Sequence, residues 1–178
     1  MTGGASCRPG RTKALDLTCG RDKPLAMFDT PVPRAALLLG FAGVLPFGWG
    51  VLTLLSDAAF GLTMQTIGPR FVGPYVLLSY GTVILSFMSG VLWGFATRAE
   101  GATAALGYSL SVIPALWGFF MVGNGPISAA TNLIIGFIGV LMIDYFFWIN
   151  RLAPPWWMAL RIPLSALVCA CLLAPVLI

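Results

Sequence analysis

The sequence predicts an all-α membrane protein, a polytopic bundle of about five transmembrane helices. Hydrophobic residues make up 58% of the 178 residues, charged residues only 9%, and the mean hydropathy is +0.92. These values lie far outside the range of water-soluble domains, so we expect most of the chain to lie in lipid. Apolar runs of transmembrane length are the second observation, because a helix needs ~20 residues to cross a ~30 Å hydrocarbon core.

Strands are the competing interpretation of apolar runs in a membrane protein. A membrane barrel shows alternating polarity over roughly ten-residue segments. The runs in this chain are apolar on every side and show no such alternation. Helices are therefore predicted for all of them.

Residues 1–33 are predicted to form a disordered polar tail ahead of a single membrane domain, residues 34–178. The tail is rich in Gly, Pro, Arg, Lys and Asp and has no apolar periodicity, so burial cannot offset the entropy of ordering it. Met27 lies just before the first apolar run, which leaves open whether translation begins at Met1 or at Met27.

Five apolar segments are the predicted helices. In chain order they cover residues 35–55, 72–96, 103–122, 127–148 and 156–177. The connections between them are short and contain the Gly and Pro residues that end helices. Prolines also fall inside or near the ends of the segments, where each removes a backbone donor and is expected to bend its helix. These prolines are Pro46, Pro114, Pro163 and Pro175.

Basic residues predict the orientation of the bundle. Six of the ten Lys and Arg residues lie within the first 34 residues, which is typical of a topology signal rather than of a nucleic-acid-binding patch. If the N-terminus is cytoplasmic, the flanks on that side contain Arg21, Lys23, Arg34, Arg98, Arg151 and Arg161, against only Arg70 on the other side. The positive-inside rule then places the N-terminus in the cytoplasm and the C-terminus outside.

Four tryptophans are predicted to anchor the cytoplasmic interface of the bundle. They are Trp93, Trp148, Trp156 and Trp157, all near segment ends assigned to that side. Tryptophan is enriched where the bilayer meets water because its ring is amphipathic. The aromatic residues therefore support the same orientation as the basic residues.

Asp144 is the clearest ionisable residue within a predicted membrane segment. A charge at the bilayer centre costs ~2.5–3.5 kcal/mol even on the lenient insertion scale, so the carboxylate needs a partner. If the chain reverses at Leu152-Ala153, Asp144 lies eight residues before the turn and Arg161 eight after it, at similar depth. We predict an intramembrane ion pair between them. A structural link between two helices is the favoured interpretation, and a proton or anion site is the alternative.

Small residues recur at helical spacing on two segments and predict close helix packing. They are Ser86, Gly90 and Gly94 on the second segment and Gly107, Ser111 and Ala115 on the third. Small side chains let helix backbones approach closely, which favours association in lipid. We expect these residues to pack within the chain, with docking of another protein as the alternative.

Side chains that commonly carry chemistry are scarce. Histidine is absent, and with it the commonest metal ligand. Cys7, Cys19, Cys169 and Cys171 have neither metal-binding nor CxxC spacing. The serines lack a neighbouring general base or oxyanion motif. The sequence therefore predicts no enzymatic activity, no metal, no cofactor and no nucleic-acid partner.

Three stretches resemble a known family. They are residues 40–47 (GFAGVLPF), residues 80–94 (YGTVILSFMSGVLWG) and residues 136–145. They are similar to an uncharacterised family of bacterial and mitochondrial membrane proteins that includes transmembrane protein 69, and the resemblance covers roughly residues 34–177. It implies a five-helix protein of the bacterial inner membrane, with the mitochondrial inner membrane as the alternative, and adds no catalytic residue.

Two functions follow as hypotheses from these patterns. Small-residue stripes, short loops and the lack of catalytic groups favour an accessory or assembly subunit that docks by its helices to a larger membrane complex. Asp144, Arg161 and the proline-containing helices motivate the alternative, a small transporter or channel. An odd number of helices and the lack of a visible internal repeat count against the second hypothesis.

Overall fold

The computed structural model describes residues 31–123 and 125–178, and this part of the chain is helical without any strand. Its elements are α1 (Arg34–Ala42), α2 (Leu45–Leu55), α3 (Asp57–Thr66), η2 (Pro69–Phe71), α4 (Gly73–Ala96), α5 (Gly101–Met121), α6 (Pro126–Ile149) and α7 (Trp157–Leu177). The predicted all-α class is confirmed. Most of the predicted tail lies outside the described residues, together with Met1, Cys7, Cys19, Arg21, Lys23 and Met27.

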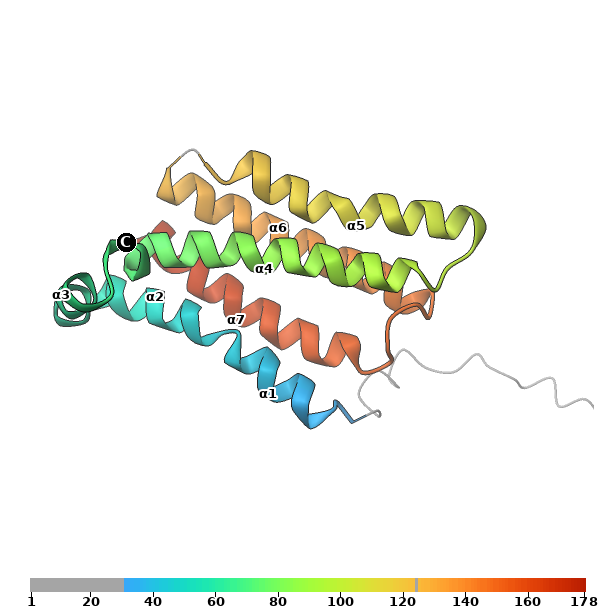
Figure 1. Cartoon of the computed structure of the whole chain (residues 1–178), viewed down its shortest axis with the longest axis horizontal. Coiled ribbons are helices and arrows are strands. Elements are labelled where there is room, and N and C mark those ends of the chain that lie inside the picture. The colour runs from blue at the N-terminus through green and yellow to red at the C-terminus, as the bar shows by residue number, and fades with distance from the viewer. Residues whose placement is uncertain (1–30, 124) are drawn as a thin grey trace, which may run out of the picture.

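Five segments of the described chain are long and apolar enough to span a membrane. They are Arg34–Leu55, which combines α1 and α2, and the four long helices α4, α5, α6 and α7. Each begins and ends within two residues of the range that the sequence predicts. Figure 1 shows these helices side by side, with successive spans running in opposite directions. The chain is thus a membrane-spanning helix bundle.

The first span is interrupted at Gly43 and Val44, between α1 and α2. Pro46 has no backbone N–H to donate to the carbonyl of Ala42, and its ring clashes with that carbonyl in a continuous helix. The chain ends α1 at Ala42 and places Pro46 in the first turn of α2, where a missing donor costs nothing. By contrast, α5 continues through Pro114, and α7 through Pro163 and Pro175.

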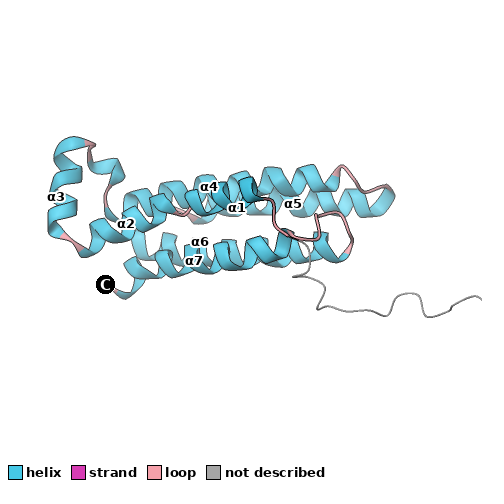
Figure 2. Ribbon diagram, turned by 90° about the horizontal axis from the view of Figure 1, so that it is seen from below, coloured by secondary structure: helices cyan, strands magenta, loops and turns pink. Residues whose placement is uncertain are grey.

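Helix α3 differs from the sequence prediction, in which residues 56–71 are only a connection between the first two spans. Ser56 begins this helix by accepting a hydrogen bond from the Ala59 N–H at 3.4 Å, and Asp57 adds an acidic residue to the first turn. Figure 2 shows α3 running across the axis of the bundle at one end. The short helix η2 then leads into α4.

Helix α4 lies at the centre of the bundle and packs against α2, α5 and α6. Its inward face contributes Leu77, Leu85 and Leu92, none of which has any exposed surface. Gly50 permits the close approach of α2, because a Cβ atom there would lie only 2.6 Å from Leu77 Cγ. Large apolar side chains on the outside, such as Phe119 at 77% exposure, face the surroundings of the bundle. That surface suits lipid rather than water.

Candidate functional site

A polar cluster is buried where α6 ends and α7 begins. The chain reverses between these helices with Arg151 in the left-handed region (φ 57°), and the Leu152 and Ala153 N–H groups both donate to the Phe147 carbonyl. This turn satisfies a carbonyl near the end of α6 and sets α7 antiparallel to it. Asp144 on α6 consequently faces the first turns of α7.

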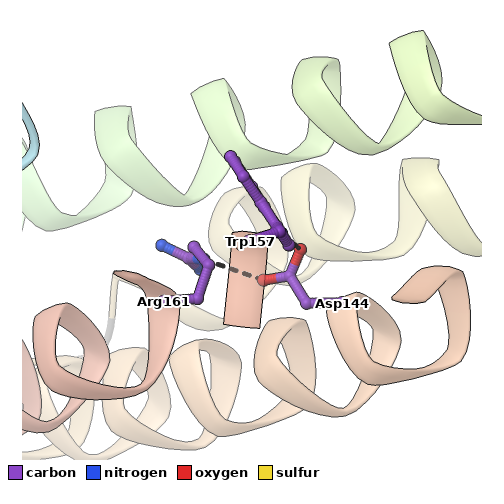
Figure 3. Close-up of polar contacts among 3 residues, drawn as sticks. All are labelled: Asp144, Trp157 and Arg161. Atoms are coloured by element: carbon purple, nitrogen blue, oxygen red, sulfur yellow. Dashed lines mark hydrogen bonds and ion pairs between the residues drawn. The ribbon is translucent and has the colours of Figure 1, made fainter. Parts of the chain in front are cut away.

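The carboxylate of Asp144 accepts two hydrogen bonds from α7. Arg161 Nε donates to Oδ2 and Trp157 Nε1 donates to Oδ1, each at 2.8 Å (Figure 3). Asp144 has no exposed surface and Arg161 is 6% exposed. The structure thus brings together the two residues that the sequence paired, as a single Nε–Oδ2 ion pair within the described chain.

Trp157 has a second role besides the interfacial one that its position suggests. Its indole contacts the ring of Phe95 on α4 edge-on, with centroids 5.0 Å apart and planes at 90°. This contact orients the indole N–H toward the Asp144 carboxylate. Trp157 was not predicted as a donor to Asp144, although its position four residues before Arg161 puts both side chains on one face of a helix and could have indicated it.

The other predicted anchors lie at the same end of the bundle as Trp157, where α4 and α6 end and α7 begins (Figure 1). Trp93 is half-exposed and packs against Tyr108 with ring centroids 4.7 Å apart. Trp148 Nε1 donates to the Pro155 carbonyl at 3.2 Å. Trp156 is partly buried and packs against the ring of Trp157. Four indoles therefore gather at one end of the molecule.

Arg161 and Ser165 contribute polar atoms that the cluster does not use. The Nη2 atom of Arg161 and the Oγ atom of Ser165 are buried and have no hydrogen-bond partner among the described residues. Figure 3 shows the nitrogen-bearing end of the Arg161 side chain pointing away from Asp144. Both residues line a cavity of about 150 Å³ between the first span, α4, α6 and α7.

The two predicted small-residue stripes have different environments. On α5, Gly107 and Ser111 are buried, and a Cβ atom at Gly107 would lie 3.1 Å from the Ala96 side chain of α4. Ser111 also accepts a hydrogen bond from the Ser89 hydroxyl at its carbonyl, and Ala115 is partly buried. This stripe packs against α4 within the chain.

The stripe on α4 lies on the outside of the bundle, so the expectation that it packs within the chain is wrong. Ser86, Gly90 and Gly94 are exposed. A Cβ atom at either glycine would meet nothing within 4 Å in the described part of the chain. The inward face of α4 is formed instead by a leucine-rich stripe that includes Leu85 and Leu92. The larger side chains bury more contact surface and therefore determine which face turns inward.

The groups that commonly hold a metal are dispersed in the structure. No three His, Cys, Asp or Glu side chains lie together among residues 31–123 and 125–178. Cys169 and Cys171 on α7 are partly buried free thiols. Asp144, Trp157 and Arg161 form the buried polar cluster of the described chain, and the outer stripe of α4 is its unpartnered helix face.

Comparison with known proteins places the chain in a family. Residues 32–177 match the family described as "Protein of unknown function (DUF3429)". The chain belongs to this family. Transmembrane protein 69 of Xenopus tropicalis is 30% identical over 141 residues, which cover 76% of this chain and 50% of that protein. Transmembrane protein 69 of Mus musculus is 27% identical over 140 residues, covering 76% and 52%.

The chain therefore spans about half the length of these curated relatives. Their name agrees with the five membrane-spanning segments seen here. The resemblance expected from the sequence is confirmed. No solved structure matches the chain.

Proposed function

We propose that this membrane protein is a non-enzymatic accessory or assembly subunit that docks against another membrane protein through the outer face of α4. The observation that carries the proposal is the small-residue stripe of Ser86, Gly90 and Gly94, which is exposed and unused in packing by the described chain. Large apolar residues on a lipid-facing surface are ordinary. A stripe of small residues allows the backbone of a second helix to approach closely.

The neighbours of the stripe support this function. Val83 and Phe87, 60% and 64% exposed, flank the small residues on the same helix. A partner helix seated on the stripe would contact the backbone of α4 between such larger side chains. Association in lipid depends on packing of this kind because the bilayer removes the hydrophobic drive that operates in water.

A substitution at Gly90 tests the proposal. Gly90→Leu fills the stripe, and Gly139→Leu is the matched control, since Gly139 on α6 also has no atom within 4 Å of an added Cβ in the described chain. In native-membrane purification, the wild type and Gly139→Leu should retain a partner at defined stoichiometry, and Gly90→Leu should lose it. A partner retained equally by both variants, or only monomer in all three samples, would contradict the proposal.

The orientation and location belong to the same proposal. We place the protein in the inner membrane of a bacterial cell, with the mitochondrial inner membrane as the alternative. Arg34, Arg98 and Arg151 flank the spans at one end of the bundle and Arg70 lies at the other, which supports a cytoplasmic N-terminus and an external C-terminus.

A small transporter or channel is the second candidate. It is favoured by the unpartnered Arg161 Nη2 atom beside a cavity, since an intramembrane charge with an open donor can contact a permeating group. Substrate-dependent flux into liposomes that Asp144→Asn abolishes would support transport. Flux at the level of empty liposomes, together with loss of the partner in Gly90→Leu, would favour docking.

A further inference from the structure

The cavity beside Arg161 exists because the first span is broken and glycine-rich at this level. Gly40 lets α1 approach α7 closely, since a Cβ atom there would lie 2.9 Å from Leu164 Cδ1. Gly43 then ends α1, and both glycines line the cavity. Leu39 and Phe87, 74% and 64% exposed, belong to the same lining. The cavity therefore reaches the outer surface of the bundle, where the surroundings are lipid.

Ser165 is unlike other serines on these helices. The hydroxyls of Ser79, Ser86 and Ser109 each donate to the carbonyl four residues earlier, at 2.7 to 2.9 Å. Ser165 is only 4% exposed and makes no hydrogen bond among the described residues. A buried polar group without a partner costs free energy, so the unpaired Ser165 hydroxyl indicates a missing acceptor.

Arg161 provides a second donor on the same helical face, one turn before Ser165. Its Nε atom is used by Asp144, whereas its Nη2 atom is buried without a partner in the described chain. Two donors four residues apart thus border one cavity, and the rest of its lining is almost entirely apolar. Such a site suits a molecule with one hydrogen-bond acceptor and an apolar body.

The charge balance restricts the acceptor to a neutral one. Asp144 already neutralises Arg161 at 2.8 Å, so a bound anion would leave an uncompensated negative charge in a buried site. A carbonyl oxygen accepts two hydrogen bonds and adds no charge. Arg161 also lies one turn from the start of α7, close to the interfacial tryptophans, so the carbonyl would be bound near the edge of the hydrocarbon core.

We propose that this cavity is a binding site for the carbonyl group of a neutral lipid-soluble molecule, which enters from the bilayer past Leu39 and Phe87. Arg161 Nη2 and Ser165 Oγ donate to the carbonyl oxygen, while the apolar body of the ligand extends out of the cavity, whose volume of about 150 Å³ holds only its end. The cavity borders the docking stripe at Phe87, but both of its donors lie on α7, so this inference does not rest on the docking proposal.

Two isotope-labelled probes distinguish the sources of such a carbonyl. The full chain is placed in nanodiscs of ether-linked lipids, which contribute no ester carbonyl. A decyl-benzoquinone and a diacylglycerol, each labelled with ¹³C at the carbonyl carbon, are titrated separately. We expect saturable one-to-one binding of one probe, with its carbonyl band in difference infrared spectra moved to lower wavenumber by hydrogen bonding. The probe that binds identifies the ligand class.

Ser165→Ala removes one donor with little change in volume, and Ser109→Ala makes the same substitution at an exposed site. Ser165→Ala should weaken binding about fivefold, as expected for loss of one neutral hydrogen bond, and should move the carbonyl band back toward its unbound position. Ser109→Ala should change neither quantity. Ser165→Leu fills the cavity and should abolish binding if it folds.

Several results would overturn the proposal. They are a failure of both probes to bind the wild type, binding with an unshifted carbonyl band, and equal affinity in the wild type and Ser165→Ala. The first of these is also expected if ordinary water molecules alone occupy the cavity. None of these outcomes bears on the loss of a protein partner in Gly90→Leu.

Discussion

The losses of stability caused by removing either partner of the Asp144–Arg161 pair should not add up when both charges are removed together. Asp144→Asn leaves the Arg161 charge buried without its counterion, and Arg161→Gln leaves the carboxylate with only the Trp157 donor. At an effective dielectric constant of about 20, unit charges about 4 Å apart attract each other by about 4 kcal/mol. Losing one partner of a buried pair typically costs ~3–5 kcal/mol, because the other charge stays uncompensated.

The double variant has no stranded charge, so its loss should be well below the sum of the single losses. We expect each single change to lower the free energy of unfolding by about 3 kcal/mol, roughly a hundredfold in the folded-to-unfolded ratio. The double change should restore at least ~2 kcal/mol relative to additivity, which is within the range of coupling seen for contacting residues.

The measurement is denaturant unfolding in bicelles, followed by far-ultraviolet circular dichroism, with the yield of monodisperse protein as a second readout. Asp57→Asn and Arg70→Gln make the same chemical changes at exposed positions, so each should alter stability by less than ~0.5 kcal/mol. If the losses of the two single variants simply add in the double variant, the ion pair does not link α6 to α7 energetically, and the structural interpretation fails.

Two further predictions concern packing and topology. Gly50→Ala should destabilise the bundle by ~1–3 kcal/mol, because its Cβ atom would lie 2.6 Å from a side-chain carbon of α4. Gly48→Ala should be tolerated, because a Cβ atom there meets nothing within 4 Å in the described chain. Equal unfolding midpoints for the two variants would refute this prediction. In a chain without its native cysteines, Glu100→Cys should react with a membrane-impermeant maleimide only from the cytoplasmic side, and Arg70→Cys only from the outside. The reverse labelling pattern would refute the proposed orientation.

The positions of the spans can be predicted from the sequence because they depend only on the length of each apolar run. A helix that crosses the hydrocarbon core needs a minimum length of apolar residues, whichever way each side chain points. Pro154-Pro155 and the glycines at 123 and 125 limit these runs sharply. The rotation of each helix about its axis depends instead on its packing against neighbouring helices. On α4 the small-residue stripe and the leucine-rich stripe were both available, and packing against three neighbours selected the second.

The candidate site was partly predictable for a similar reason. Asp144 and Arg161 stand out because ionised groups are rare and costly in lipid, and a symmetric distance from one turn brings them to equal depth. Trp157 shares a helix face with Arg161, but an indole near an interface has an ordinary explanation, and so does Ser165 within a helix. Their roles depend on Phe95 from α4 and on the cavity left by the break in the first span, which are contacts between distant segments.

Helix α3 leads to a last prediction, about the surface of the membrane. Phe60, Met64 and Ile67 recur at helical spacing and are 43%, 40% and 57% exposed, so they form an apolar face that the described chain does not cover. Gln65 lies on another side of the same helix, 100° away from Met64. Because α3 runs across the bundle axis at its end (Figure 2), we expect it to lie in the interface with Phe60, Met64 and Ile67 toward the acyl chains, and Leu62, 62% exposed, on the opposite side from Met64. A spin label at position 64 should then collide more with oxygen, which concentrates in lipid, and a label at position 65 more with a water-soluble nickel complex. Equal collision rates at both positions would mean that α3 stands clear of the bilayer, and its exposed apolar face would then need a protein to cover it.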